Sequence, residues 1–473
     1  MKKINVIWIL LVTFSFSACS DWFDISPKTE VKSKDLFLTE AGFKSALTGI
    51  YGMMTREHLY GRDLSFLFLE QLAQRYDNNP DATDEQRGKI YDYENLSSSK
   101  EALSSIWNSM YRNIANINNL LYNIEMNGKN IITPGYYELI KGEALALRAF
   151  HYFDLLRMWG PIYQLHPTDN AVPFRDQFNA DKTPLMKANE LLEKIIADLK
   201  EAENLLQDDP MDYLGNPNQP FVGFRQQRMN KYAAKALLAR AYLYQGDETG
   251  KIKAAEKAKE VIDSCGLLLV RNNREDRTMF DETLFGLNVF NMSERITPYF
   301  TAAVGQNGTE LWISLANAKE VFEVATCGIN DIRYKNGYGF IHNDTKLMCR
   351  KYLKGTSLNY EEKIPLIRLS EMYYIMAEAL PLGADADYYC NAVRNARGIS
   401  RKNDVHFNDE AFRLDVLQKE YGKDFFAEGQ LFYFLKRNAR TNFYRCPFEE
   451  GMKLSYYVFK IPDDEVEFGS VSK

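Results

Sequence analysis

The feature that most constrains the fold is a helical spacing of apolar residues that recurs along the chain. The clearest stripe repeats at steps of three and four positions and consists of Trp107, Met110, Tyr111, Ile114, Ile117, Leu120 and Leu121. Such spacing places all its members on one face of an α-helix. Similar stripes occupy 143–159 and 186–206, and Gly160-Pro161 ends the first of them. We therefore expect a mainly α-helical protein.

Two neighbouring stripes indicate how the helices pack. Leu238-Ala239, Tyr242 and Gly246 are followed by Ala254, Ala258 and Val261. Small residues allow two helices to approach closely and glycine makes the turn, so the pair resembles a tetratricopeptide repeat, with a loop about three residues longer than that repeat allows. One hairpin cannot bury its apolar face alone. We expect the helices at 107–126, 143–159 and 186–206 to stack on it.

Residues 266–362 lose the helical period and scatter glycine, asparagine and aromatic residues. We expect an irregular, loop-rich region there, with short strands at 267–270 and 311–314. Helical patterns resume at 365–379, with Pro365 suited to the first turn, and continue near 385–397 and 409–437. Because loops on a rigid scaffold commonly carry binding function, the irregular region is the expected place for a ligand site.

The N-terminus has the layout of a secretory signal. Met1-Lys2-Lys3 precede an apolar run that ends in Ser17-Ala18-Cys19. A cysteine at this point resembles a bacterial lipoprotein signal, in which that cysteine is acylated and becomes the new N-terminus. The alternative is an ordinary signal peptide with an incidental cysteine. We predict a signal peptide over 1–18, a lipidated tether over 19–35 and a single helical domain over 36–473, held to the membrane by its lipid anchor only.

Composition excludes several classes of partner. The formal charge is −6 and the chain has no basic run, which argues against nucleic acid and anionic lipid as partners. Besides Cys19 there are five cysteines, an odd number, and none has CxxC spacing, so neither a closed disulfide framework nor a structural zinc site is indicated. Tyrosine and phenylalanine, at 29 each, supply rings that suit contacts with a hydrated ligand.

No catalytic constellation is visible in the sequence. None of the five histidines lies in HExxH spacing, and nucleophile-elbow, Walker and dinucleotide motifs are absent. We interpret the acid pairs Asp208-Asp209 and Asp463-Asp464 as solvated turns, since glycosidase chemistry needs carboxylates at a defined spatial separation. Arg368, Glu371 and Glu378, which have a helical spacing, are better explained as scaffold ion pairs or caps than as catalytic groups. We expect no enzyme activity, metal or cofactor.

Aromatic and planar polar residues outside the stripes are the candidates for ligand binding. A sugar ring packs its C–H face on an aromatic ring, while its hydroxyl groups pair with Asn, Asp and Arg. The candidate residues are Arg75, Tyr76, Asp77, Asn78, Tyr91, Tyr93, Tyr299, Trp312, Tyr334 and Tyr338. The alternative for each is an aromatic or polar residue that packs in or beside the core.

Short motifs distributed over most of the chain resemble the SusD/RagB family of outer-membrane nutrient-binding lipoproteins. They are Trp107-x3-Tyr111-x2-Ile114-x-Asn116, Glu143-Ala144 leading to Arg148-Ala149-Phe150-x-Tyr152-Phe153-Asp154-Leu155, Gly160-Pro161-Ile162, Ala239-Arg240-Ala241-Tyr242-Leu243, Arg368-Leu369-x-Glu371-x6-Glu378-Ala379, Asn391-x2-Arg394-x2-Arg397, Glu428-Gly429 and Ile461-Pro462-x2-Glu465. Leu431 and Phe434 stand where family members often have Arg and Asp, which indicates a divergent branch.

The resemblance implies a function but no sugar-contacting residue, because those lie in variable loops. It implies a non-catalytic, surface-exposed outer-membrane lipoprotein that captures glycan or oligosaccharide for import by a SusC-like TonB-dependent transporter. Two alternatives remain. One is a helical-repeat lipoprotein that scaffolds envelope assembly, and the other is capture of peptide instead of glycan.

Overall fold

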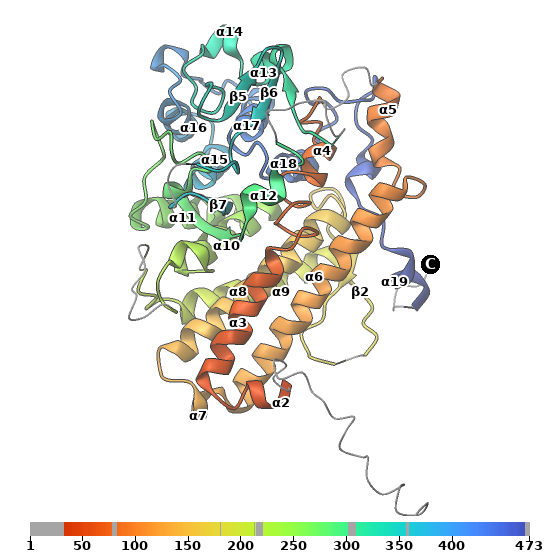
Figure 1. Ribbon diagram of the computed structural model, residues 1–473, viewed down its shortest axis with the longest axis vertical. Helices are drawn as coiled ribbons and strands as arrows, with labels where there is room; N and C mark the ends of the chain where they lie inside the picture. Colours follow the sequence, from red (N-terminus) through yellow and green to blue (C-terminus); the bar gives the residue numbers. More distant parts are fainter. Residues whose placement is uncertain are drawn as a thin grey trace, which may run out of the picture.

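The computed structural model describes residues 33–77, 83–179, 181–211, 213, 221–300, 309–355 and 359–468. It is mainly helical, as the apolar spacing predicts (Figure 1). The longer helices are α3 (Glu40–Met54), α6 (Ser97–Asn123), α8 (Tyr136–Trp159), α9 (Ala188–Leu205), α10 (Lys231–Gln245), α11 (Glu248–Ser264), α15 (Leu369–Ala379), α16 (Ala384–Ala396), α17 (Glu410–Asp424) and α18 (Gln430–Arg437).

Shorter elements connect and cover these helices. The short α-helices are α2 (Ser33–Leu36), α4 (Phe68–Leu72), α5 (Asp84–Gly88), α7 (Lys129–Ile131), α12 (Met292–Ile296), α13 (Leu315–Val321), α14 (Val324–Cys327) and α19 (Asp463–Phe468). The strands are β1 (Asn170–Pro173), β2 (Leu185–Lys187), β3 (Thr283–Asn288), β4 (Ile313–Ser314), β5 (Phe340–Asn343), β6 (Lys346–Cys349) and β7 (Lys363–Arg368). Helix α2 begins inside the segment that the sequence assigns to the tether.

Consecutive long helices pair as hairpins, and the hairpins stack. Helix α8 packs on α9, α10 on α11, and α15 on α16. Contacts of α9 with α10, and of α11 with α15, join the three hairpins, while α6 and α3 extend the stack beyond α8. In Figure 1 the helices α3 and α6 to α11 form the lower and middle part of the molecule, α15 and α16 lie above them, and α13 and α14 lie at the opposite end from α2 and α7. The arrangement matches the neighbour-on-neighbour packing predicted from the repeat-like pattern.

The α10–α11 hairpin is defined by its local sequence. The side chain of Asn230 accepts hydrogen bonds from the backbone N–H groups of Tyr232 and Ala233, both at 2.9 Å, and so caps α10. Gly246 ends the helix with a φ of +81°, which glycine adopts at little cost. Only Gly246 and Asp247 connect the helices, so the expected longer loop is wrong. The extra residues form the first turn of α11, which begins at Glu248.

The region 266–362 contains short strands between helical turns and loops. Strand β3 pairs antiparallel with β7, and β4, β6 and β5 form a second small sheet. The strand expected within 311–314 is β4, whereas 267–270 contains no strand. Pro365 lies in β7 opposite Gly286 and not in a helix, because α15 begins only at Leu369. The residues from Ile364 to Arg368 are buried, so buried and exposed positions do not alternate along this segment. The spacing of its apolar residues therefore cannot distinguish a strand from a helix.

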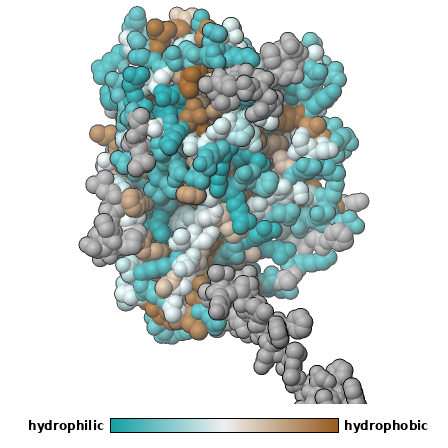
Figure 2. All heavy atoms as spheres, viewed as in Figure 1, coloured by the Kyte–Doolittle hydropathy of each residue, from teal (hydrophilic) through white to brown (hydrophobic). Residues whose placement is uncertain are grey.

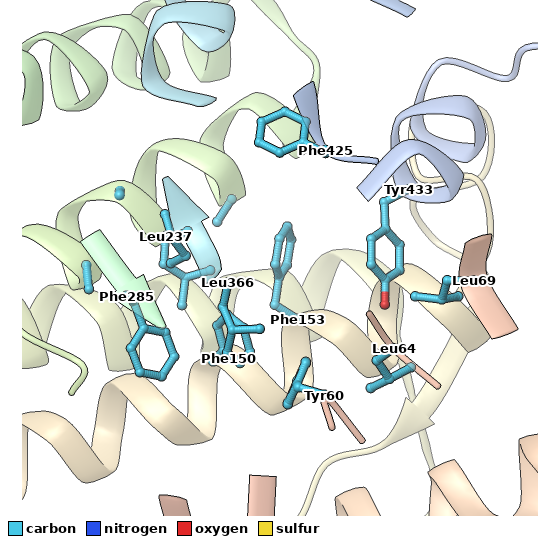
Figure 3. Packing of buried hydrophobic residues seen from close by; sticks show 14 of the residues in the cluster. Tyr60, Leu64, Leu69, Phe150, Phe153, Leu237, Phe285, Leu366, Phe425 and Tyr433 are labelled. Atoms are coloured by element: carbon cyan, nitrogen blue, oxygen red, sulfur yellow. The ribbon is translucent and has the colours of Figure 1, made fainter. Parts of the chain in front are cut away.

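One large hydrophobic core joins the helical stack to the irregular region. Figure 3 shows Phe150 and Phe153 of α8 between Phe285 of β3 and Phe425, which follows α17. The rings of Phe150 and Phe285 meet edge to face at 5.8 Å. Both sheets and the long helices therefore depend on the same core, which fixes the irregular region on the scaffold.

Buried ion pairs join segments that are distant in sequence. The carboxylate of Asp424 in α17 contacts Arg397 at 2.8 Å, Arg368 at 3.0 Å and Arg333 at 3.4 Å. Glu282, the residue directly before β3, contacts Arg368 at 2.7 Å and Arg397 at 2.6 Å. We call these residues the Asp424 network. All of their side chains are at most 2% exposed, and Arg333 also pairs with Asp331 at 2.7 Å, so each buried charge faces an opposite charge inside the protein.

The three charged residues interpreted as scaffold ion pairs are confirmed in that role. Arg368 belongs to the Asp424 network. Glu371 pairs with Arg240 at 2.5 Å and Glu378 pairs with Arg437 at 2.6 Å. Each pair is buried and links two helices of the scaffold. Glu371 and Glu378 lie on α15, as the sequence pattern predicts, whereas Arg368 ends β7. The partners of all three lie far away in the chain.

Candidate ligand-binding site

Two segments predicted to bind ligand lie side by side at Asp77. The backbone N–H of Asp77 donates to the carbonyl of Trp312 at 2.6 Å. The Asp77 carboxylate accepts from the backbone of Ser314 at 2.8 Å and from the side chain of Asn317 at 2.6 Å, and it also pairs with Arg445. The structure thus brings the segments 75–77 and 312–317 together, which the sequence alone does not show.

Arg75 is buried without a carboxylate partner. Its guanidinium donates to the carbonyl of Gly422 at 2.5 Å and lies 5.0 Å from the ring centre of Phe426, while its Nε has no hydrogen-bond partner. Among the described residues, every other buried arginine except Arg277 forms an ion pair with a carboxylate. Burial lowers the pKa of Arg75, although Glu70 opposes this effect.

Arg75 lines a cavity of about 370 Å³ between α13, α14 and α17, which we call the α13–α17 pocket. Its lining residues are Arg75, Lys319, Glu320, Val321, Glu323, Ala325, Thr326, Gln418, Lys419, Gly422, Leu431, Phe443 and Tyr444. Aromatic and aliphatic groups thus share the wall with charged and amide groups, which is the composition of a small-molecule site.

The pocket connects directly to the Asp77 junction through Tyr444. The Tyr444 hydroxyl donates to the side-chain oxygen of Asn317 at 2.7 Å, and Asn317 in turn donates to Asp77. Burial, followed by the negative charge of Glu320, raises the pKa of Tyr444 to about 12. The phenol is therefore neutral at physiological pH. Its half-buried ring is held in place through Asn317 and Asp77, and Asp77 also bonds to the backbone of Trp312.

The charges around the pocket are partly compensated. Glu323 forms ion pairs with Lys419 and Lys423, both at 2.9 Å. Burial would raise the pKa of Glu323, but these two lysines lower it below its usual value. Lys319 forms no ion pair with the described residues. Arg75 and Lys319 therefore leave donors for a polar ligand.

Most of the other candidate aromatic residues pack inside the protein. Tyr76, Tyr91, Tyr93, Trp312 and Tyr334 are between 3% and 7% exposed. The hydroxyl of Tyr76 donates to Phe66, that of Tyr91 to Leu72 and that of Tyr93 to Tyr456. Their rings contact protein in this structure, whereas Tyr299 and Tyr338 are partly exposed. Whether any of them contacts ligand stays a prediction. Asn78 and Cys19 lie outside the described residues.

Sequence reasoning missed Phe443 and Tyr444, the aromatic residues of the pocket. They follow α18 in a segment without helical period, so the criterion used for the other candidates also applies to them. It missed the polar groups of α17 for a different reason. Gln418 and Lys419 lie on a helix, and the sequence does not reveal that this side of the helix borders a cavity.

The interpretation of Asp208-Asp209 as a solvated turn is wrong for Asp209. Asp209 is buried and forms an ion pair with Arg225 at 2.5 Å, so it is not part of a solvated turn. Arg225 reaches back 16 residues to make this bond, and a sequence pattern does not reveal such a partner. Asp463 and Asp464 at the start of α19 are exposed, and Asp463 pairs with Lys100.

The described residues contain no group of three His, Cys, Asp or Glu side chains arranged to hold a metal ion. Cys265, Cys327, Cys349, Cys390 and Cys446 form no disulfide with one another. In the part of the chain that the structure covers, every helix is too short or too polar to cross a bilayer.

Two family profiles match the sequence. The profile described as “Starch-binding associating with outer membrane” matches residues 21–243, and that described as “SusD family” matches residues 210–466. The SusD-like protein P2 of Formosa agariphila is 27% identical over 282 residues, which are 59% of this chain and 50% of that protein. A SusD-like protein of Bacteroides ovatus is 26% identical over 182 residues, which are 36% and 29% of the two chains. The matches thus span half of these relatives or less.

Solved structures establish the fold. A SusD superfamily protein from Bacteroides vulgatus superposes with a TM-score of 0.68 at 22% identity, covering 91% of this chain and 97% of that one. A SusD-like carbohydrate binding protein from the same species gives a TM-score of 0.63 at 18% identity, covering 90% and 96%. A structure described as “Laminarin binding SusD-like protein” gives 0.60 at 20% identity, covering 92% and 98%. The hairpin stack with its irregular region is thus an arrangement shared with SusD-like structures.

Proposed function

Because the chain belongs to the SusD family, a family of non-catalytic binding proteins, we propose that it captures oligosaccharide at the outer membrane. The bound glycan is then passed to a SusC-like TonB-dependent transporter. Family membership confirms the resemblance seen in the sequence, and the identities of at most 27% to the relatives described above agree with a divergent branch. The choice of a glycan draws on the carbohydrate-binding descriptions of two similar structures.

The single observation that carries the proposal is the α13–α17 pocket. Its volume of about 370 Å³ suits one or two sugar rings, within the usual range of small-molecule sites. Phe443 and Tyr444 supply apolar faces for the C–H side of a pyranose, and Arg75, Gln418 and Thr326 supply groups that hydrogen-bond to hydroxyls. Because the binding of hydroxyls replaces hydration, we expect a modest affinity, roughly micromolar to millimolar.

Removal of the pocket's aromatic wall is expected to weaken glycan binding. The double variant Phe443→Ala/Tyr444→Ala should lower affinity by about ten-fold or more, since two buried ring contacts each contribute roughly a kcal/mol. Isothermal calorimetry or affinity electrophoresis against a panel of starch, laminarin and other soluble glycans measures this. Thermal melting verifies that the variant is folded, because both side chains are only half-buried.

Tyr388→Ala is the matched control for this experiment. Tyr388 is 63% exposed on α16, does not line the pocket, and should bind glycan like the wild type. Unchanged affinity in a folded Phe443→Ala/Tyr444→Ala variant would exclude the pocket. Retention of a peptide pool, with no glycan bound, would favour peptide capture. Failure to bind either would favour the scaffolding alternative, and cleavage products after long incubation would indicate an enzyme.

The anchoring to the membrane is a second part of the proposal. We expect cleavage before Cys19 and acylation of that cysteine, because the preceding residues have the layout of a lipoprotein signal. Intact-mass analysis of detergent-extracted protein should show loss of residues 1–18 and the added mass of lipid. The variant Cys19→Ala should be released from the membrane fraction. A mature wild-type protein with a free Cys19 thiol would contradict the anchor.

A further inference from the structure

A group of positive charges surrounds Tyr338, away from the α13–α17 pocket. Arg274, Arg277 and Lys335 approach this tyrosine, and Arg350 contacts the neighbouring Gly337; we call these four residues and Tyr338 the Tyr338 cluster. The guanidinium carbon of Arg274 lies 5.1 Å from the centre of the Tyr338 ring, and the Nζ of Lys335 lies 5.4 Å from it. The Tyr338 hydroxyl donates to the side chain of Asn272 at 2.7 Å.

Two arginines of the cluster, Arg274 and Arg350, converge on the backbone of Gly337. A Cβ atom placed on Gly337 would meet one terminal nitrogen of Arg274 at 3.0 Å and one of Arg350 at 3.8 Å. Gly337 has a φ of +82°, so this position favours glycine, and the missing Cβ lets both guanidinium groups approach the same stretch of backbone. Two guanidinium groups that lie against the same stretch of backbone can share one carboxylate or sulfate group.

The positive charges lack ion-pair partners among the described residues. None of the four forms an ion pair with a carboxylate there, and the side chain of Arg350 donates to the carbonyl of Gly337. Arg277 is buried with one terminal nitrogen unsatisfied. Burial, and then the neighbouring charge of Arg350, lowers the pKa of Arg277, although Glu275 and Glu361 act in the opposite sense. The cluster therefore concentrates positive charge near the surface.

A cavity of about 20 Å³ adjoins the cluster and is lined in part by Asn273, Asp276, Arg277 and Tyr338. It has room for a group about the size of one water molecule but not for a sugar ring. Burial raises the pKa of Asp276 to about 7, and its carboxyl accepts backbone hydrogen bonds from Phe280 and Asp281. Asp276 is thus only partly ionised at neutral pH and does not fully offset the charge of Arg277.

We propose that the Tyr338 cluster binds a carboxylate or sulfate group carried by a saccharide, and that it is a second site, separate from the α13–α17 pocket. Arg274 and Arg350 hold the anion at Gly337, Lys335 adds charge, and the sugar ring stays outside the small cavity. The inference rests on the proposed function in one respect only, because it takes a saccharide as the carrier of the anion. Uronic acids and sulfated sugars share this chemistry.

The test compares two double variants that each remove two positive charges. Arg274→Gln/Arg350→Gln alters the cluster, and Arg56→Gln/Arg112→Gln alters two exposed arginines on other elements. Calorimetry with oligogalacturonate, a sulfated oligosaccharide and a neutral oligosaccharide of equal length measures each affinity. The wild type should bind at least one anionic oligosaccharide about ten-fold or more tightly than the neutral one, since charge-assisted bonds are the stronger ones. The cluster variant should lose this preference, and the control should keep it.

The arms of the experiment separate this inference from the proposed function. Phe443→Ala/Tyr444→Ala should retain the preference for the anionic saccharide, because it leaves the cluster intact. If the cluster variant fails to fold, Arg274→Gln/Lys335→Gln replaces it, since both side chains are exposed. Equal affinities of the wild type for charged and neutral saccharides would overturn the inference. Inorganic sulfate that binds as tightly as the sulfated oligosaccharide would overturn the saccharide as carrier.

Discussion

Replacement of Asp424 by alanine should lower the free energy of unfolding by about 3–5 kcal/mol, because removal of one partner leaves other charges buried and uncompensated. The Asp424 carboxylate contacts Arg397, Arg368 and Arg333, and its side chain is fully buried. Burial alone would raise the pKa of Asp424, but Arg397 and Arg368 lower it well below its usual range. This contribution to stability is therefore present above about pH 4 and is lost as the pH falls through the folded-state pKa.

Asp415→Ala is the matched control, because Asp415 lies on the same helix and pairs with Arg440 at the surface. Exposed pairs contribute about 0–1 kcal/mol, so the control should unfold close to the wild type. Urea denaturation followed by circular dichroism gives both free energies. An Asp424→Ala variant as stable as Asp415→Ala would mean that the network is less buried in solution than the structure indicates.

The Asp424 network also shows which contacts of the fold can be predicted from the sequence and which cannot. The ion-pair role of Arg368 was predicted from a helical spacing, although the residue ends strand β7. Its partners Glu282 and Asp424 are 86 and 56 residues away, and no local pattern connects them. Charges that meet only after the chain has folded have no periodic signature, so their pairing is a property of the tertiary structure.

Helices were predictable where one face meets solvent, because the alternation of buried and exposed residues creates the period. Helix α6 is of this kind, and its stripe was read correctly. The segment 363–368 is mostly buried as a strand and runs directly into α15, so an apolar run without a polar face was assigned to the helix. The boundary was decided by the pairing of β7 with β3, which is a contact across the irregular region.

The candidate site was predictable only in part. The sequence identified Arg75 and Asp77 as a loop with suitable groups, and Trp312 as a candidate from another region. It did not show that Asp77 joins these segments or that most of the selected rings are buried. Tyrosine is suited both to a wet ligand site and to a core in which its hydroxyl finds a carbonyl, and composition does not separate the two. The pocket residue Tyr444 emerged only from the assembled structure.

The hairpin stack leads to the second large effect. Ala239→Trp should prevent stable folding or lower the free energy of unfolding by at least about 1–3 kcal/mol, because inserted volume in a packed core forces side chains and backbone to move. Ala239 is fully buried in α10, and residues on every side of this helix are buried, since it contacts α9, α11 and α15. An indole at this position would separate neighbouring hairpins.

Glu256→Trp places the same indole on the exposed side of α11 and should leave stability nearly unchanged, because surface substitutions away from structural features usually have effects within about 0.5 kcal/mol. Thermal unfolding of both variants, with size-exclusion chromatography to detect aggregation, compares them directly. The difference in stability between the two variants separates the effect of crowding at the helix contact from the effect of tryptophan itself. If Ala239→Trp melted with the wild type, α10 would not be enclosed by its neighbours, and the stacking of the hairpins on it would have to be abandoned.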